Sequence, residues 1–165
     1  MKEFAGIVTG GTSGMGEAVV EKLLGQGAEV VAVDRNPVAL LRLKTRIATS
    51  RLYALEADVT LESAAKTLVD TCHKEFGELR FLVNCAGITG TPTPFEHTSP
   101  ADFDAVGNVN LRGTFLTMRE ARSSIYLPRP ASGLSPKRPP TPHLNGGWWA
   151  FRLLWHSKPP QKESE

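Results

Sequence analysis

Short hydrophobic runs alternate with longer amphipathic segments over most of the chain. Four runs have the length of strands and are rich in valine and leucine, at residues 4–9, 29–34, 52–57 and 79–84. Such runs are typical of strands buried on both faces of a parallel sheet. Between them, residues 15–25, 38–48 and 61–76 repeat apolar side chains at helical spacing. Thr60 is the expected N-cap of the third helix, and Ser99 with Pro100 predicts a last helix that runs to about Arg119.

This alternation predicts an α/β fold, a Rossmann-like doubly wound parallel sheet of about four strands. Right-handed crossover connections place the strands in the order 3-2-1-4. A complete dinucleotide-binding sheet of this kind has six strands, so the fold expected here is truncated.

The composition changes after about residue 120. Residues 1–118 carry 11 Lys and Arg against 14 Asp and Glu, whereas residues 119–165 carry 8 against 3 and hold 8 of the 12 prolines. Because proline blocks helix interiors, residues 1–120 are predicted to form the domain and residues 121–165 an irregular, mostly disordered tail. A reading-frame change, a retained intron or an error in the gene assignment would each produce this junction. We prefer accidental composition of the tail to a nucleic-acid or membrane-surface element.

Cysteine content and hydropathy bound the remaining possibilities. The two cysteines, Cys72 and Cys85, form no CxxC pair and have no histidine pair beside them, which favours neither a metal site nor a disulfide framework. The N-terminus lacks the pattern of a secretory signal, and no apolar stretch reaches the ~20 residues of a membrane span. We therefore expect a cytoplasmic protein with no metal, no nucleic acid and no membrane partner.

The clearest chemical signal lies between the first strand and the first helix. Gly10 permits a tight turn, Gly14 lets the backbone approach a pyrophosphate, and Gly16 allows the helix to pack close to the sheet. A helix N-terminus also offers unpaired amides and a positive dipole end to phosphate. The cofactor-binding residues predicted in this loop are Gly10, Thr12, Ser13, Gly14, Met15 and Gly16. The alternative is a glycine-rich turn with no ligand.

An acidic residue follows at the spacing that a dinucleotide site requires. Asp34 ends the second strand, where a carboxylate accepts hydrogen bonds from ribose hydroxyls and repels a 2′-phosphate. This position favours NAD. Arg35 follows directly and could grip a 2′-phosphate, so NADP stays possible. The alternative is a solvated charge at a strand end.

Together these residues resemble the short-chain dehydrogenase/reductase family over about residues 4–118. Its T-G-x-x-x-G-x-G motif matches residues 9–16 at every fixed position, and residues 84–87 are similar to its N-N-A-G segment. The resemblance implies an adenine contact for Asp58 and Val59, and a place in the cofactor groove for Asn84, Ala86 and Gly87. It also implies that Asn110 is the helical asparagine of the catalytic set. Taken singly, Asp58 could only cap a helix, Asn84 only end a strand, and Asn110 only be a polar helix residue.

The family transfers a hydride between NAD(P) and an alcohol/carbonyl pair, using a tyrosine, a lysine four residues later and a serine. Tyr53 and Tyr126 are the two tyrosines of this sequence, and Ala57 and Pro130 stand at the lysine spacing. The resemblance therefore implies an oxidoreductase of this type whose present chain lacks the catalytic residues and is inactive. The alternative is a non-catalytic dinucleotide-binding module or a truncated gene product. Neither the small-molecule substrate nor the oligomeric state follows from these motifs.

Overall fold

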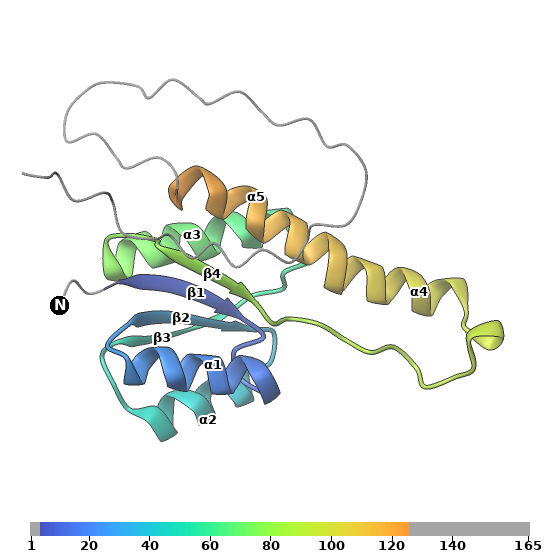
Figure 1. Cartoon of the computed structure of the whole chain (residues 1–165), viewed down its shortest axis with the longest axis horizontal. Coiled ribbons are helices and arrows are strands. Elements are labelled where there is room, and N and C mark those ends of the chain that lie inside the picture. Colours follow the sequence, from blue (N-terminus) through green and yellow to red (C-terminus); the bar gives the residue numbers. More distant parts are fainter. Residues whose placement is uncertain (1–3, 126–165) are drawn as a thin grey trace, which may run out of the picture.

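Four parallel strands form the centre of the computed structural model, which describes residues 4–125 (Figure 1). They are β1 (Ala5–Thr9), β2 (Glu29–Asp34), β3 (Leu52–Glu56) and β4 (Phe81–Asn84). The strands lie in the order β3-β2-β1-β4, with Ile7 of β1 facing Val31 on one side and Leu82 on the other. The Rossmann-like fold and the strand order expected from the sequence are confirmed. The irregular tail expected at residues 121–165 lies, from residue 126 on, outside the described residues.

Helices cover both faces of the sheet. The helices α1 (Gly14–Gly25) and α2 (Pro37–Ile47) lie on one face, and α3 (Glu62–Phe76) and α5 (Thr114–Ile125) lie on the other (Figure 1). The expectation that Thr60 caps α3 is wrong, because Leu61 holds the N-cap position. The amide and the hydroxyl of Thr60 instead both donate to Asp58 Oδ1, at 2.9 and 2.8 Å.

The last predicted helix is one continuous rod with a widened middle. It consists of α4 (Pro100–Val106), the π-helical segment η2 (Gly107–Gly113) and α5, and a short 3-10 helix, η1 (Phe95–His97), precedes it. The start is as predicted, since Ser99 Oγ accepts the Asp102 amide at 3.1 Å. The predicted end near Arg119 is wrong, because α5 continues to Ile125. Ala121 and Ile125 pack against the core, and this burial supports the extra turn.

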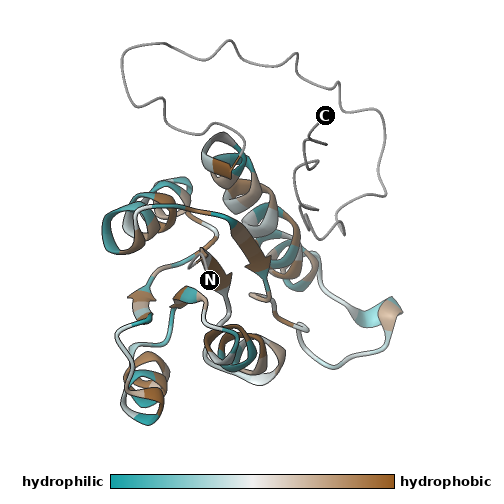
Figure 2. Ribbon diagram, turned by 60° about the vertical axis from the view of Figure 1, so that its left-hand side comes forward, coloured by the Kyte–Doolittle hydropathy of each residue, from teal (hydrophilic) through white to brown (hydrophobic). Residues whose placement is uncertain are grey.

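Successive side chains of each strand point to opposite faces of the sheet, so the core has two layers. Val30 and Ala32 of β2 pack on the α1–α2 side, while Val31 and Val33 pack on the α3 side. Figure 2 shows hydrophobic residues concentrated in the strands and on the helix faces turned towards them. Within residues 4–125, β4 pairs with β1 alone, so it forms an edge of the sheet and its residues are only half-buried. None of the helices in this part of the chain is long and apolar enough to cross a bilayer.

Candidate functional site

A cleft of about 180 Å³ lies where the strands end at their carboxyl side. Parallel α/β sheets bind ligands at this edge, where loops from several strands converge. Eight of the site residues predicted from the sequence line the cleft, namely Gly10, Ser13, Asp34, Arg35, Asp58, Val59, Ala86 and Gly87. Its wall does not include the other six, Thr12, Gly14, Met15, Gly16, Asn84 and Asn110.

Two glycines bring the turn, the first helix and the end of β4 into close contact. Gly10 has a φ of +63°, and a Cβ on it would lie 2.7 Å from the amide nitrogen of Ala86. A Cβ on Gly16 would lie 2.0 Å from the carbonyl oxygen of Gly10. Any side chain at either position would therefore push the backbone apart. Main chain therefore packs directly on main chain where the turn, the start of α1 and the segment after β4 meet.

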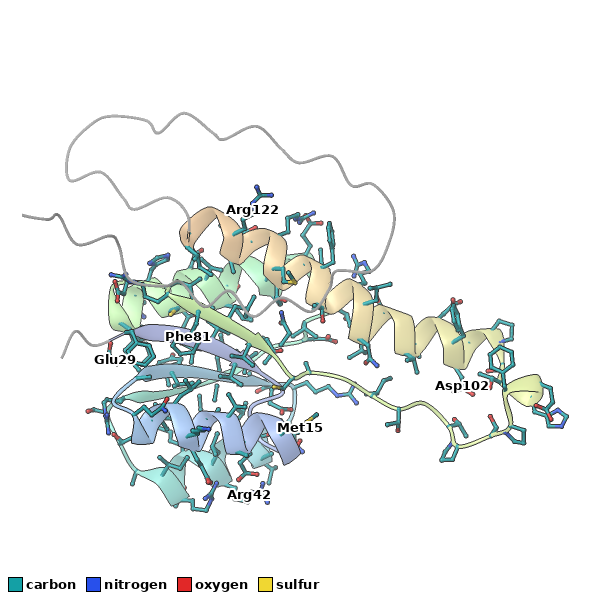
Figure 3. The ribbon with its side chains drawn as sticks, viewed as in Figure 1. Met15, Glu29, Arg42, Phe81, Asp102 and Arg122 are labelled. Carbon is teal, nitrogen blue, oxygen red and sulfur yellow. The ribbon has the colours of Figure 1, made fainter. Side chains whose placement is uncertain are left out.

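The start of α1 is left without a side-chain cap. Ser13 holds the N-cap position but makes no capping hydrogen bond, whereas Asn36 caps α2 by accepting the amides of Val38 and Ala39. The first amides of α1 therefore stay available to an anion in the cleft. Met15 is 82% exposed, and its side chain projects from the first turn of α1 (Figure 3).

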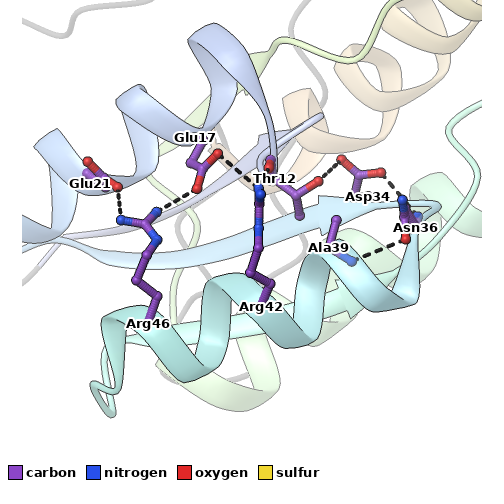
Figure 4. Close-up of polar contacts among 8 residues, drawn as sticks. All are labelled: Thr12, Glu17, Glu21, Asp34, Asn36, Ala39, Arg42 and Arg46. Carbon is purple, nitrogen blue, oxygen red and sulfur yellow. Dashed lines mark hydrogen bonds and ion pairs between the residues drawn. The ribbon is translucent and has the colours of Figure 1, made fainter.

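The carboxylate of Asp34 is held by two donors from different segments (Figure 4). Its Oδ2 accepts the hydroxyl of Thr12 at 2.5 Å, and its Oδ1 accepts the amide of Asn36 at 3.1 Å. A carboxylate has about four acceptor positions, so the group still has capacity for a ligand. The side chain is thus fixed at the cleft wall and remains able to accept hydrogen bonds.

A second carboxylate lines the cleft at the end of β3. Hydrogen bonds from the amide and then the hydroxyl of Thr60 lower the pKa of Asp58, and the positive charge of Arg35 lowers it further. Asp58 is therefore ionised at neutral pH. Arg35 is exposed and lines the same cleft as the two aspartates.

Asn84 serves the scaffold rather than the cleft wall. Its Oδ1 accepts the hydroxyl of Thr117 at 2.8 Å and that of Thr9 at 3.3 Å. Thr9 Oγ1 in turn accepts the amide of Ala86 at 3.3 Å. These bonds join β1, β4 and α5 beneath the cleft. The side chain of Asn84 is thus a hydrogen-bond acceptor at the end of β4, and its place in a cofactor groove stays a prediction.

The π-helical segment η2 holds two of the cleft walls in place. Asn110 Oδ1 accepts the Ile88 amide at 2.8 Å, and Asn110 Nδ2 donates to the Ile88 carbonyl at 2.9 Å. Arg112 donates to the carbonyl of Thr60, and Gly113 packs directly against Val59. The segment after β4 and the turn after β3 are therefore both fastened to the same rod.

The sequence missed several residues that the structure brings to the site. Cys85 and Ile88 line the cleft beside Ala86 and Gly87, and Val109 reaches it from η2. Cys85 stands within the recognised Asn-Cys-Ala-Gly segment, so its position carried a signal. Val109 looks in the sequence like any other apolar helix residue. Within residues 4–125, no three His, Cys, Asp or Glu side chains gather into a set that could hold a metal ion.

The comparisons with known proteins agree with this geometry. The sequence model of the family described as short chain dehydrogenase matches residues 5–133. The chain is 38% identical over 127 residues to (+)-borneol dehydrogenase 2 of Salvia officinalis, covering 74% of this chain and 44% of that protein. It is 32% identical over 139 residues to 3-hydroxyacyl-CoA dehydrogenase type-2 of Homo sapiens, covering 81% and 52%.

A solved structure of a related enzyme has the same fold over most of this chain. The crystal structure of 3-ketoacyl-(acyl-carrier-protein) reductase from Brucella melitensis complexed with NADH superposes with a TM-score of 0.70 at 32% identity. The match covers 73% of this chain and 50% of that one. The chain spans about half the length of the curated relatives it matches. The family model, the relatives and the fold lead to one conclusion: the chain belongs to the short chain dehydrogenase family.

Proposed function

We propose that this chain binds a nicotinamide dinucleotide in the cleft, with NAD preferred over NADP. The supporting observation is that eight residues, predicted from segments far apart in the sequence, line a single cleft. The diphosphate would rest on the turn at residues 10–16 and the uncapped start of α1. The cleft is smaller than the ~300–1,000 Å³ of ordinary ligand pockets, so we place only the adenosine half of the dinucleotide within it.

The preference for NAD rests on the charge that faces the ribose. Asp34 is fixed at the wall by two hydrogen bonds, and its free lone pairs can accept the ribose hydroxyls. A 2′-phosphate would bring two like charges together there. Arg35 is exposed and would favour a phosphate, but Asp34 is fixed at the wall by its two hydrogen bonds, so we give Asp34 the larger weight.

We further propose that these 165 residues bind the coenzyme without turning it over. Bound nicotinamide supplies a hydride acceptor or donor for an alcohol/carbonyl pair, which is the chemistry of the family. The chain's own residues bind and orient the dinucleotide, but no Tyr-x-x-x-Lys is present to move the proton. Asn110 uses both ends of its amide on the Ile88 backbone. It therefore holds the segment after β4 against η2.

The cytoplasmic location stays a prediction.

The test is a titration of the purified full chain with NADH and NADPH, followed by coenzyme fluorescence. We expect saturable NADH binding that Asp34→Ala weakens about ten- to hundredfold, since a hydrogen bond to a charged group contributes ~1.5–3 kcal/mol. Asp70→Ala is the matched control, because Asp70 is an exposed acid on α3 outside the cleft. No binding of either coenzyme would refute the assignment. Oxidation of bound NADH by any member of a carbonyl panel would refute the absence of turnover.

A further inference from the structure

Thr12 lies in the glycine-rich turn but does not line the cleft. It is 2% exposed, so its hydroxyl is shut off from bulk water and needs a partner inside the protein. That partner is Asp34 Oδ2, at 2.5 Å. Short contacts of this kind between a hydroxyl and a carboxylate are stronger than neutral hydrogen bonds. Thr12 therefore acts on the cleft through Asp34 and not by direct contact.

The second donor to the carboxylate comes from the start of α2. The amide of Asn36 binds Asp34 Oδ1, while the side chain of Asn36 caps α2. With one donor on each oxygen, from two different elements, the plane of the carboxylate is set. Loss of the Thr12 hydroxyl would leave the carboxylate tethered at one oxygen only. It could then turn about its side-chain bonds.

The backbone of Thr12 is itself held from α2. Arg42 donates to the Thr12 carbonyl at 3.0 Å and pairs with Glu17 at 3.3 Å (Figure 4). Arg46 binds the other oxygen of Glu17 at 2.5 Å. Both arginines are about half exposed, and such pairs contribute little to stability. Their geometric effect is to hold the loop against α2, with the Thr12 hydroxyl directed at Asp34.

We propose that Thr12 is the positioning residue that sets coenzyme discrimination, by holding the Asp34 carboxylate at the cleft wall. A fixed carboxylate accepts a ribose with a free 2′-hydroxyl and repels a 2′-phosphate. A carboxylate released from Thr12 turns away from an incoming phosphate and also loses its preset position for the hydroxyls. The inference rests on the proposed function, since it requires that the dinucleotide's adenosine half binds beside Asp34.

The test compares Thr12→Val with Thr12→Ser in the full chain, using the Kd of NADH and of NADPH for each. Valine has the shape of threonine without the hydroxyl, and serine keeps the hydroxyl. Thr67→Val is the control, because Thr67 is an exposed threonine on α3. We expect Thr12→Val to weaken NADH about tenfold and to leave NADPH unchanged or tighter, so the ratio of the two constants falls about tenfold or more. Thr12→Ser and Thr67→Val should keep the ratio of the unaltered chain.

A merely structural role for Thr12 predicts a different result, because a loosened fold weakens both coenzymes alike and leaves the ratio unchanged. That outcome would overturn the inference while the proposed function stands. Failure of the unaltered chain to bind NADH would overturn the proposed function itself. A coenzyme-free measurement separates the two further: a double-mutant cycle of Thr12→Val and Asp34→Ala on urea unfolding. Coupling of about tenfold in the unfolding constant is expected, and zero coupling would contradict the bond.

Discussion

The contact between Gly16 and the turn at Gly10 gives the sharpest quantitative test of the site. In Gly16→Ala the new Cβ would stand 2.0 Å from the carbonyl oxygen of Gly10, whereas real Cβ contacts essentially never fall below 3.0 Å. The two backbones must therefore separate by about 1 Å, and no side-chain rotation can relieve the clash. Overpacking costs about 1–3 kcal/mol. Alanine offsets about 0.5–1 kcal/mol of this because it favours the helix.

The net loss for Gly16→Ala is therefore about 1–2 kcal/mol, or roughly 2–8 °C in Tm at about 2–4 °C per kcal/mol for a chain of this length. Two matched variants isolate the cause. Gly25 lies on the same helix as Gly16, and a Cβ on it would meet no neighbouring atom within 4 Å. Gly25→Ala should therefore be neutral or slightly stabilising. Gly14→Ala also meets open space, but Gly14 has a φ of +50°, so we expect a cost of about 1–2 kcal/mol from backbone strain alone.

The assay is urea unfolding followed by circular dichroism, with NADH titration of each variant at a concentration of urea where all are folded. Gly16→Ala should also lose most NADH affinity, because the turn and the start of α1 move apart. The reasoning is refuted if Gly16→Ala unfolds at the same urea concentration as Gly25→Ala. It is refuted equally if Gly16→Ala is destabilised but binds NADH as the unaltered chain does.

Three further predictions follow from other contacts. Gly113→Ala places a Cβ 2.9 Å from Val59 Cγ2 and should weaken NADH binding several-fold by pushing Val59 into the cleft. Gly107→Ala, whose Cβ meets open space, should leave the Kd of NADH unchanged, and a titration of each variant with NADH measures the difference. Thr117→Val removes a buried hydroxyl from Asn84 and should destabilise the chain by about 1–3 kcal/mol, more than Thr114→Val at a half-buried site, as read from urea midpoints. Burial raises the pKa of the Cys72 thiol to about 12 and also raises the pKa of Cys85, so both thiols need alkaline pH to form thiolate. After treatment with iodoacetamide, mass spectrometry should show that Cys85 is alkylated before the buried Cys72, and that NADH protects Cys85 because it lines the cleft.

Much of the fold followed from the hydrophobic pattern because parallel strands have a simple signature. The runs of β1 and β2 are buried on both faces, those of β3 and β4 are mostly half-buried, and the segments between the runs have helical spacing. Crossover handedness then sets the order of the strands. Helix ends were less predictable. Threonine is a common N-cap residue, but the hydroxyl of Thr60 donates a hydrogen bond to Asp58 instead. Which of these two interactions forms depends on the local turn and not on residue type.

Site residues could be predicted where a close approach of the backbone requires glycine. They could not be predicted where two side chains from distant parts of the sequence form a hydrogen bond. Glycines at fixed spacing report a close approach directly, as at Gly10 and Gly16. Nothing in the sequence links Thr12 to Asp34, or Asn110 to Ile88, because these pairs meet only after the sheet has formed. The π-helical widening of η2 was also invisible, since its apolar spacing resembles that of an ordinary helix.

The clasp of Asn110 on the backbone of Ile88 constrains which side chain can stand at position 110. An asparagine side chain is a peptide group in miniature, with one donor and one acceptor in a plane. At Ile88, four residues beyond the end of β4, it pairs with both backbone groups of one residue, as a neighbouring peptide group could. This position therefore selects for chemical pattern and not for size: exchange of one nitrogen for oxygen, as in aspartate, would set two acceptors face to face without altering the shape.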